Sequence, residues 1–194
     1  MELLKQQVTQ TVKDAIKGDT ASFEQLVQIH QNRVYSLSLR LTGTAHDAED
    51  LAQEVFVKAY RFISSFRADA DFGTWLHRIA INTWLNRKRK MTPVAAFSLD
   101  EPIGMDEAEV KREVADFSAD PEKVYFDNQM SERLQRAVES LPKEQKAIIL
   151  LREVEDYSYE EIAQIMDCSV GTVRSRLSRA RDALRKCYNG LTEI

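Results

Sequence analysis

The scarcity of turn-forming residues is the feature that most limits how this chain can fold. Its 194 residues include only 6 glycines and 4 prolines. A fold of many short strands needs such residues at each reversal, whereas long helices need few of them. Apolar residues also recur at helical spacing, as they do between Ser22 and Leu41. The sequence therefore predicts an all-α protein.

Charge is distributed unevenly and divides the chain into three parts. The net charge is -4, but residues 98–127 alone have 3 Lys or Arg against 10 Asp or Glu and no sustained apolar period. Such a stretch cannot bury enough apolar surface to pack by itself. We predict two small helical domains, residues 1–95 and 128–194, joined by an acidic linker at residues 96–127. A surface helix over residues 108–117 is an alternative for part of that linker.

The N-terminal half contains a helix with two different faces. Gly43 is expected to end the helix that begins near Ser22, and Thr44 is expected to cap the next one. On that next helix, small and apolar residues such as Leu51 project to one side. The opposite face has Asp50, Gln53, Glu54 and Val57. This outer face is either an ordinary solvated surface or a surface for a partner protein.

The segment that follows combines aromatic, amide and cationic side chains. On a helix over residues 74–90, a strip of Arg78, Asn82, Asn86 and Arg89 runs beside Trp75. Rings can stack on bases, amides can contact base edges and cations can neutralise phosphates, so the strip suits single-stranded nucleic acid. The alternative is that the tryptophans belong to the core and that the terminal cations complement the helix dipole.

The C-terminal half has the most specific pattern, a helix-turn-helix. A helix over residues 143–154 opens with Pro142 at its first position, and Ser158 with Glu161 forms a capping box for the next helix. Ser169 then caps a last helix that is rich in arginine. Its outward residues suit major-groove contacts, and Arg179 could pair with guanine. The predicted contacts are Gly171, Thr172, Arg174, Ser175, Arg176, Ser178 and Arg179.

Five blocks, in this order, resemble the extracytoplasmic-function (group 4) sigma factors of bacterial RNA polymerase. They are Asp47–Phe56, Phe72–Asn82, Leu141–Pro142, Tyr159–Ala163 and Gly171–Arg176. The resemblance implies a promoter-binding subunit without chemistry of its own, with sigma region 2 in the first domain and region 4 in the second. It also implies that the subunit binds core polymerase through the clamp helices and the flap.

The resemblance assigns each surface a role at the promoter. It places the outer face with Asp50, Gln53, Glu54 and Val57 on the polymerase, and the helix-turn-helix on the -35 element. It implies that the segment around the tryptophans melts and holds the -10 element. The residues expected there are Arg67, Phe72, Thr74, Trp75, Arg78, Asn82, Arg87 and Arg89.

Other functions fit the sequence less well. A stand-alone helix-turn-helix regulator would explain the C-terminal half but not residues 72–90. An enzyme built on His46 and Asp47, with His30 and His77 as further ligands, has no recognisable metal spacing. We therefore expect no metal and no cofactor.

No apolar run approaches the roughly 20 residues of a membrane helix, and two cysteines cannot make a multi-bridge framework. These features favour a cytoplasmic protein, and the resemblance implies an anti-sigma factor as a further partner.

Overall fold

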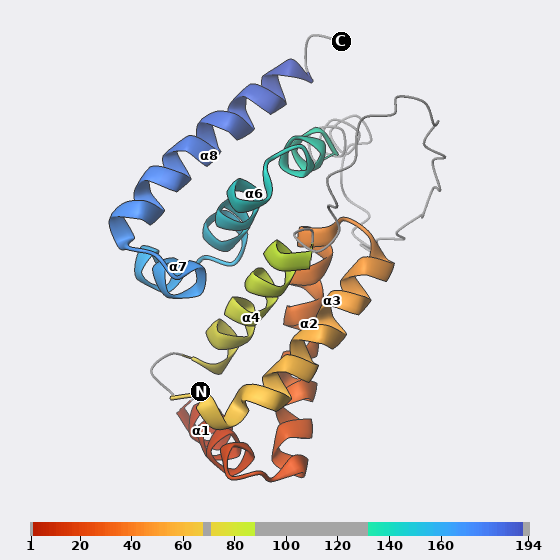
Figure 1. Cartoon of the computed structure of the whole chain (residues 1–194), viewed down its shortest axis with the longest axis vertical. Helices are drawn as coiled ribbons and strands as arrows, with labels where there is room; N and C mark the ends of the chain where they lie inside the picture. Colours follow the sequence, from red (N-terminus) through yellow and green to blue (C-terminus); the bar gives the residue numbers. More distant parts are fainter. Residues whose placement is uncertain (1, 68–70, 88–131, 192–194) are drawn as a thin grey trace, which may run out of the picture.

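The computed structural model describes residues 2–67, 71–87 and 132–191, and every regular element in these ranges is helical (Figure 1). This confirms the all-α prediction. The N-terminal half consists of α1 (Glu2–Ile16), α2 (Thr20–Thr42), α3 (Ala45–Phe62), the 3-10 turn η1 (Ile63–Ser65) and α4 (Phe72–Arg87). The C-terminal half has helical residues at 132–139, then α6 (Lys143–Ile149), η2 (Leu150–Val154), α7 (Tyr159–Met166) and α8 (Val170–Gly190).

Polar side chains and one glycine fix the helix ends of the N-terminal half. Gly43 has a φ of 86°, and its N–H donates to the Leu39 carbonyl, as expected for a glycine that ends a helix. The Thr44 hydroxyl accepts from the backbone N–H of Asp47 and so caps α3. Both predicted boundaries are confirmed.

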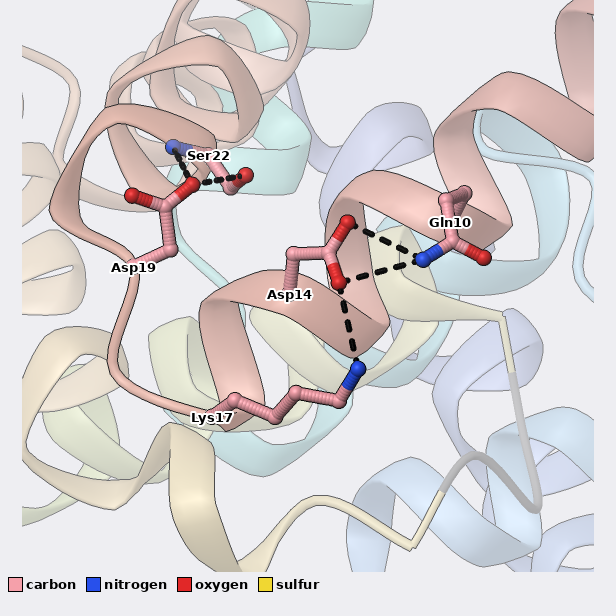
Figure 2. Close-up of polar contacts among 5 residues, drawn as sticks. All are labelled: Gln10, Asp14, Lys17, Asp19 and Ser22. Carbon is pink, nitrogen blue, oxygen red and sulfur yellow. Dashed lines mark hydrogen bonds and ion pairs between the residues drawn. The ribbon is translucent and has the colours of Figure 1, made fainter.

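The connection between α1 and α2 shows why α2 begins earlier than the apolar pattern indicates. Asp19 caps α2 by accepting from the backbone N–H and the hydroxyl of Ser22 (Figure 2). On α1, the carboxylate of Asp14 accepts from Gln10 and pairs with Lys17. The capping aspartate is therefore the local reason why α2 already begins at Thr20.

Helices α2, α3 and α4 pack together around an apolar core. Their fully buried side chains include Leu26, Leu37, Leu51, Leu76 and Ile81. Each fully buried leucine or isoleucine contributes about 1.5–3 kcal/mol relative to an exposed one. The polar strip on α4 is therefore positioned by a rigid bundle rather than by a loop.

The C-terminal half differs from the prediction before α7. The expected single helix over residues 143–154 divides into α6 and the π-helical turn η2, and Pro142 is the N-cap rather than the first helical residue. In this turn the backbone N–H of Glu155 donates to the carbonyl of Leu150, and that of Tyr157 to the carbonyl of Leu151. A π-turn accommodates an extra residue compared with an α-helix, so it changes the direction of the side chains that follow.

The helix-turn-helix itself forms as predicted. Ser158 and Glu161 make the reciprocal capping box of α7, and Ser169 caps α8 by accepting from the N–H of Thr172. Asp167, between the two helices, has a left-handed φ of 51°. The described ranges contain no helix that is both long and apolar enough to span a bilayer.

The two halves are in contact. Helix α4 packs against α7 and, less extensively, against α6, and Figure 1 shows the C-terminal helices lying beside α4. Helix α4, on which part of the polar strip lies, is therefore packed against the first helix of the helix-turn-helix.

Candidate nucleic-acid interface

Helix α8 exposes one face and buries the other. Val173, Leu177 and Ala180 are buried against α6 and α7. We call the seven predicted contacts the recognition face, and the structure places them together on the outer side of α8. Of these, Gly171, Arg174, Ser175, Ser178 and Arg179 are exposed, whereas Thr172 and Arg176 are half-buried.

A recess of about 370 Å³ adjoins the recognition face. It is lined by Thr172, Arg176 and Arg179 from α8 and by Glu144 and Gln145 from α6. The Nε of Arg179 donates to the carbonyl of Ser175 at 3.3 Å, so its guanidinium lies along its own helix. Guanidinium groups beside a hydroxyl can contact phosphates and base edges. The geometry therefore suits a DNA groove.

A neighbouring arginine on α8 is used differently. Arg181 makes an ion pair with Glu153 of η2 at 2.7 Å, and both side chains are about half exposed. This pair holds α8 against η2 within the C-terminal half.

Several of the residues predicted for the -10 element surround one groove. This groove, here the α4 groove, has a volume of about 490 Å³. Arg67, Thr74, Trp75 and Arg78 contribute to it together with Ser65 and Phe66. Its other wall comes from the C-terminal half, through Gln164 and Ile165 of α7.

An aromatic cluster supports the floor of the α4 groove. The ring centroids of Phe66, Phe72 and Trp75 lie 5.1–5.5 Å from one another. Phe72 and Thr74 are buried, while Trp75 is half-buried and Arg67 and Arg78 are exposed. Trp75 can therefore offer a ring to a base, whereas Phe72 acts through the packing of its neighbours.

The remaining predicted -10 residues are not in the α4 groove. Asn82 is exposed further along α4, and Arg87 lies at the end of that helix. Arg89 lies outside the described residues. Arg87 pairs instead with Glu54 at 3.0 Å, although the sequence interpretation assigned these two residues to different surfaces.

The outer face of α3 is partly apolar. Asp50, Gln53 and Val57 are exposed, and Val57 is 45% exposed. Gln53 and Val57 line a shallow hollow with Phe23, Phe56, Tyr60 and Arg61. Tyr60 was missed by the sequence analysis, although its spacing from Gln53 and Val57 places it on the same helical face.

Glu54 belongs to that face but points toward two cations. Its carboxylate lies 2.8 Å from the Nζ of Lys58 and 3.0 Å from the Nε of Arg87. Partial burial acts to raise the pKa of Glu54, but the hydrogen bonds from Lys58 and Arg87 outweigh it, so the pKa is lowered. The carboxylate remains ionised and links α3 to α4.

A set of polar contacts joins the two halves, and we call it the latch. It consists of Arg33, Arg40 and His77 from the N-terminal half and Glu155 and Tyr157 from the C-terminal half. Glu155 is 2.9 Å from Arg40 and 3.6 Å from Arg33, and its side chain is only 8% exposed. The Tyr157 hydroxyl is 2.9 Å from Nδ1 of His77.

The protonation states in the latch follow from burial. Arg33 donates to the Tyr157 oxygen at 3.5 Å, which leaves the Tyr157 proton available to His77. Burial lowers the pKa of His77 to about 3, and the positive charge of Arg33 adds to this effect. His77 is therefore neutral, and its Nδ1 shares one hydrogen bond with the Tyr157 hydroxyl. Sequence analysis could not find this pair, because its members are 80 positions apart.

Two further contacts lie beside the latch. Lys143 donates to the Trp84 carbonyl at 3.0 Å and stands over the Trp84 ring at 4.6 Å. Arg78 pairs with Asp167 at 3.7 Å. Among the described residues, no three His, Cys, Asp or Glu side chains form a cluster that could hold a metal ion.

Comparison with known families gives two matches in the order of the two halves. The family described as Sigma-70 region 2 matches residues 15–92, and the family described as Sigma-70, region 4 matches residues 131–184.

Individual relatives match over most of the chain. The RNA polymerase sigma-H factor of Pseudomonas aeruginosa is 36% identical over 192 residues, which cover 97% of each chain. The ECF RNA polymerase sigma-E factor of Escherichia coli K12 is 40% identical over 171 residues, 87% of each chain. A solved structure of the sigma factor RpoE from Bartonella quintana, in complex with the anti-sigma factor NepR, is 25% identical. It superposes with a TM-score of 0.60 over 86% of this chain and 96% of that one.

Proposed function

The chain belongs to the sigma-70 family, as an extracytoplasmic-function (ECF) sigma factor of RNA polymerase, and from this premise we propose which of its surfaces performs each step at a promoter. An ECF sigma factor binds core RNA polymerase, directs it to specific promoters and helps to melt the -10 element. It is not itself an enzyme. A stand-alone helix-turn-helix regulator is not favoured, because the region 2 match accounts for the N-terminal half as well.

The recognition face of α8 reads the -35 element. Arg179 and the serines at positions 175 and 178 contact base edges, while Thr172 and the flanking arginines contact phosphates. The exposure of this face and the arginine-lined recess beside it support this assignment.

The α4 groove holds the melted strand of the -10 element. Trp75 stacks on a base, and Arg67 and Arg78 neutralise phosphates at the groove rim. Unstacking a base costs a few kcal/mol, which stacking and pocket contacts on the captured strand offset. The convergence of these three side chains on one groove is the observation that carries the assignment.

The outer face of α3 binds the clamp helices of the polymerase. Val57 and Tyr60, 45% and 53% exposed, provide apolar contact, and Asp50 and Gln53 provide polar contacts beside them. The C-terminal half contacts the flap.

We propose region 2 in residues 1–95, the acidic linker in 96–127 and region 4 in 128–194; the family matches to residues 15–92 and 131–184 support this division, and the linker lies outside the described residues. The Bartonella quintana relative was solved with an anti-sigma factor, which supports an anti-sigma factor as a partner of this chain as well. The protein acts in the cytoplasm, where the polymerase is.

The function is tested by run-off transcription with core RNA polymerase on a promoter library, with and without this chain. We expect specific run-off products only when the chain is present. Association with core polymerase without any promoter-specific product would contradict the function.

Trp75→Ala tests the α4 groove. We expect this variant to slow open-complex formation on duplex templates by about tenfold or more, because base stacking contributes about 1–3 kcal/mol. Binding to the -35 element should remain unchanged, and a pre-melted template should restore part of the activity. Equal loss on duplex and pre-melted templates would indicate a folding defect and argue against the assignment.

A further inference from the structure

A cavity of about 630 Å³ lies beside the end of α4, and we call it the junction cavity. Its volume falls within the range of roughly 300–1,000 Å³ that is typical of small-molecule sites. Both halves of the chain contribute charged and aromatic side chains to its wall. These are Asp47, Trp84 and Arg87 from the N-terminal half and Glu139, Lys143 and Lys146 from the C-terminal half.

Lys146 is a buried cation that lines this cavity. It is only 6% exposed, and within the part of the chain that the structure describes its amine makes neither a hydrogen bond nor an ion pair. Burial lowers the pKa of Lys146, and the negative charge of Glu139 opposes this effect only in part. A buried cation without a close partner costs stability. An anion in the cavity would supply the partner that the described residues do not.

Two further cations are held on the cavity wall by contacts within the protein. The Nζ of Lys143 donates to the Trp84 carbonyl at 3.0 Å and stands 4.6 Å from the centroid of the Trp84 ring. The Nε of Arg87 pairs with Glu54 at 3.0 Å, and its Nη1 donates to the carbonyl of Asp47 at 3.4 Å. These contacts position both cations before any ligand binds, as an anion site requires.

The carboxylates of Asp47 and Glu139 determine which kind of anion suits the cavity. A carboxylate repels a bare phosphate but accepts hydrogen bonds from hydroxyl groups. A ligand that has both a phosphate and hydroxyl groups therefore matches the cations and the carboxylates together. Trp84 is only 6% exposed and Lys143 stands over its ring, so the cavity offers no aromatic face for stacking. A sugar phosphate fits this wall better than an aromatic anion does.

We propose that the junction cavity binds a small phosphorylated sugar. The phosphate pairs with Lys146, Lys143 and Arg87. The hydroxyl groups of the sugar donate to the carboxylates of Asp47 and Glu139. This site is separate from the three surfaces proposed above for promoter and polymerase, and it does not depend on their assignment. Because both halves line the cavity, the ligand stabilises the chain in the arrangement that this structure shows.

The test uses thermal unfolding of the full chain at constant ionic strength, with ribose 5-phosphate as the probe. We expect the melting temperature to rise with probe concentration, as it does for a ligand that binds only the folded state. Ribose without the phosphate should have no effect. Inorganic phosphate should have a smaller effect than ribose 5-phosphate at equal concentration, because it lacks the sugar hydroxyls.

Lys146→Met removes the ammonium group and keeps a long side chain. Without ligand this variant should melt no lower than the wild type, because the substitution removes the cost of a buried cation. Its Kd for ribose 5-phosphate, from the concentration dependence of the melting temperature, should be about tenfold higher, as expected for one charge-assisted hydrogen bond. Lys143→Gln should weaken binding as well, and this half-exposed position keeps the test decisive if Lys146→Met does not fold.

Lys17→Met is the matched control. Lys17 is 73% exposed and pairs with Asp14 of α1, away from the junction cavity, so this variant should bind the probe like the wild type. A melting temperature of the wild type that does not change across the titration would overturn the proposal. An equal rise in the wild type, Lys146→Met and Lys143→Gln would also overturn it, because the probe would then bind to other cations of the chain.

Discussion

Arg179 lies on the exposed side of α8, where its guanidinium reaches back toward Ser175. We expect Arg179→Ala to weaken binding of the holoenzyme to -35 DNA by about 1–3 kcal/mol, the contribution of one good bidentate base contact. The measurement is a competition titration against promoter fragments with each base pair of the element changed in turn. Discrimination should be lost at one base pair and kept at the others.

Arg185→Ala is the control for this prediction, because it removes the same charge from the same helix. Arg185 is exposed and pairs with Asp182 one turn away. It should lower affinity for all sequences equally or have no effect. An equal loss of discrimination in both variants would contradict the role of Arg179.

His77 makes the stability of the fold depend on pH. Its pKa is about 3 in the folded chain against an ordinary value near 6.5, and Arg33, His30 and Tyr157 surround it. Below pH 6.5, His77 takes up a proton in the unfolded chain but stays neutral in the folded chain. The contribution of His77 to stability is therefore fully present above pH 6.5 and is lost as the pH falls toward 3, by about 1.4 kcal/mol per pH unit.

This effect can be measured by urea unfolding at pH 7.5 and pH 5.5. We expect the wild type to lose about 1.4 kcal/mol more than His77→Gln between these two values, since glutamine does not titrate. The pKa of His30 is also lowered, first by burial, and this residue stays in both proteins. Identical losses in the two proteins would contradict the prediction.

Sequence patterns identified exposed residues better than buried ones. Arg78, Ser175 and Arg179 are exposed as expected, because helical spacing alone decides which side of a helix they occupy. Phe72 and Thr74 were expected at the DNA but are buried, since the aromatic cluster and Tyr157 cover them. Whether a side chain at the edge of a helix face is covered depends on a partner that the local sequence does not reveal.

At the scale of elements, α7 is short and depends on its cap. Its 8 residues are held at the N-terminus by the reciprocal contacts between Ser158 and Glu161. We expect Ser158→Ala to lower the free energy of unfolding by about 1 kcal/mol. Urea unfolding followed by circular dichroism measures this loss.

Ser178→Ala provides the comparison for stability, because Ser178 is exposed in the middle of α8. Alanine has the higher helix propensity there, so the substitution should be neutral or slightly stabilising. If both alanine variants lose the same stability, the cap does not carry the effect.

Most helix boundaries could be predicted because their signals are local. Gly43, Thr44, Ser158 and Ser169 each act within three or four residues of their own position. The π-turn at η2 could not be predicted, because residues 143–154 show an uninterrupted helical pattern. The cost of the extra residue in this turn is offset by tertiary contacts. Glu155 and Tyr157 make these contacts with the N-terminal half.

At the scale of the whole molecule, we expect the acidic segment to weaken binding of the free chain to DNA. Residues 98–127 have 3 Lys or Arg against 10 Asp or Glu. Phosphate neutralisation supplies most non-specific affinity, and this segment opposes it. We expect replacement of its carboxylates by amides to raise the affinity of the free chain for random duplex DNA several-fold at low salt.

Anisotropy titrations at low and physiological salt check this expectation. A variant with the same segment in shuffled order keeps the charge and should behave like the wild type. If the shuffled variant changes as much as the neutralised one, residue order rather than charge controls the affinity.

The arrangement of the two halves could not be predicted from the sequence. Region 2 and region 4 could each be assigned from their own motifs, but the latch joins residues 80, 115 and 124 positions apart. Such pairs leave no periodic signal. Glu155, for example, occurs in an unremarkable acidic stretch, and only the approach of α2 makes it a buried bridge.

The same latch has a consequence for concentrated protein. Its two sides belong to halves joined by a single covalent path, so each half can pair equally well with its counterpart in a second molecule. Exchange of this kind becomes favourable as protein concentration approaches the effective concentration of a tethered partner, about millimolar. The reciprocal dimer would keep every latch contact of the monomer, and each of its two α4 grooves would be lined by α7 of the other molecule.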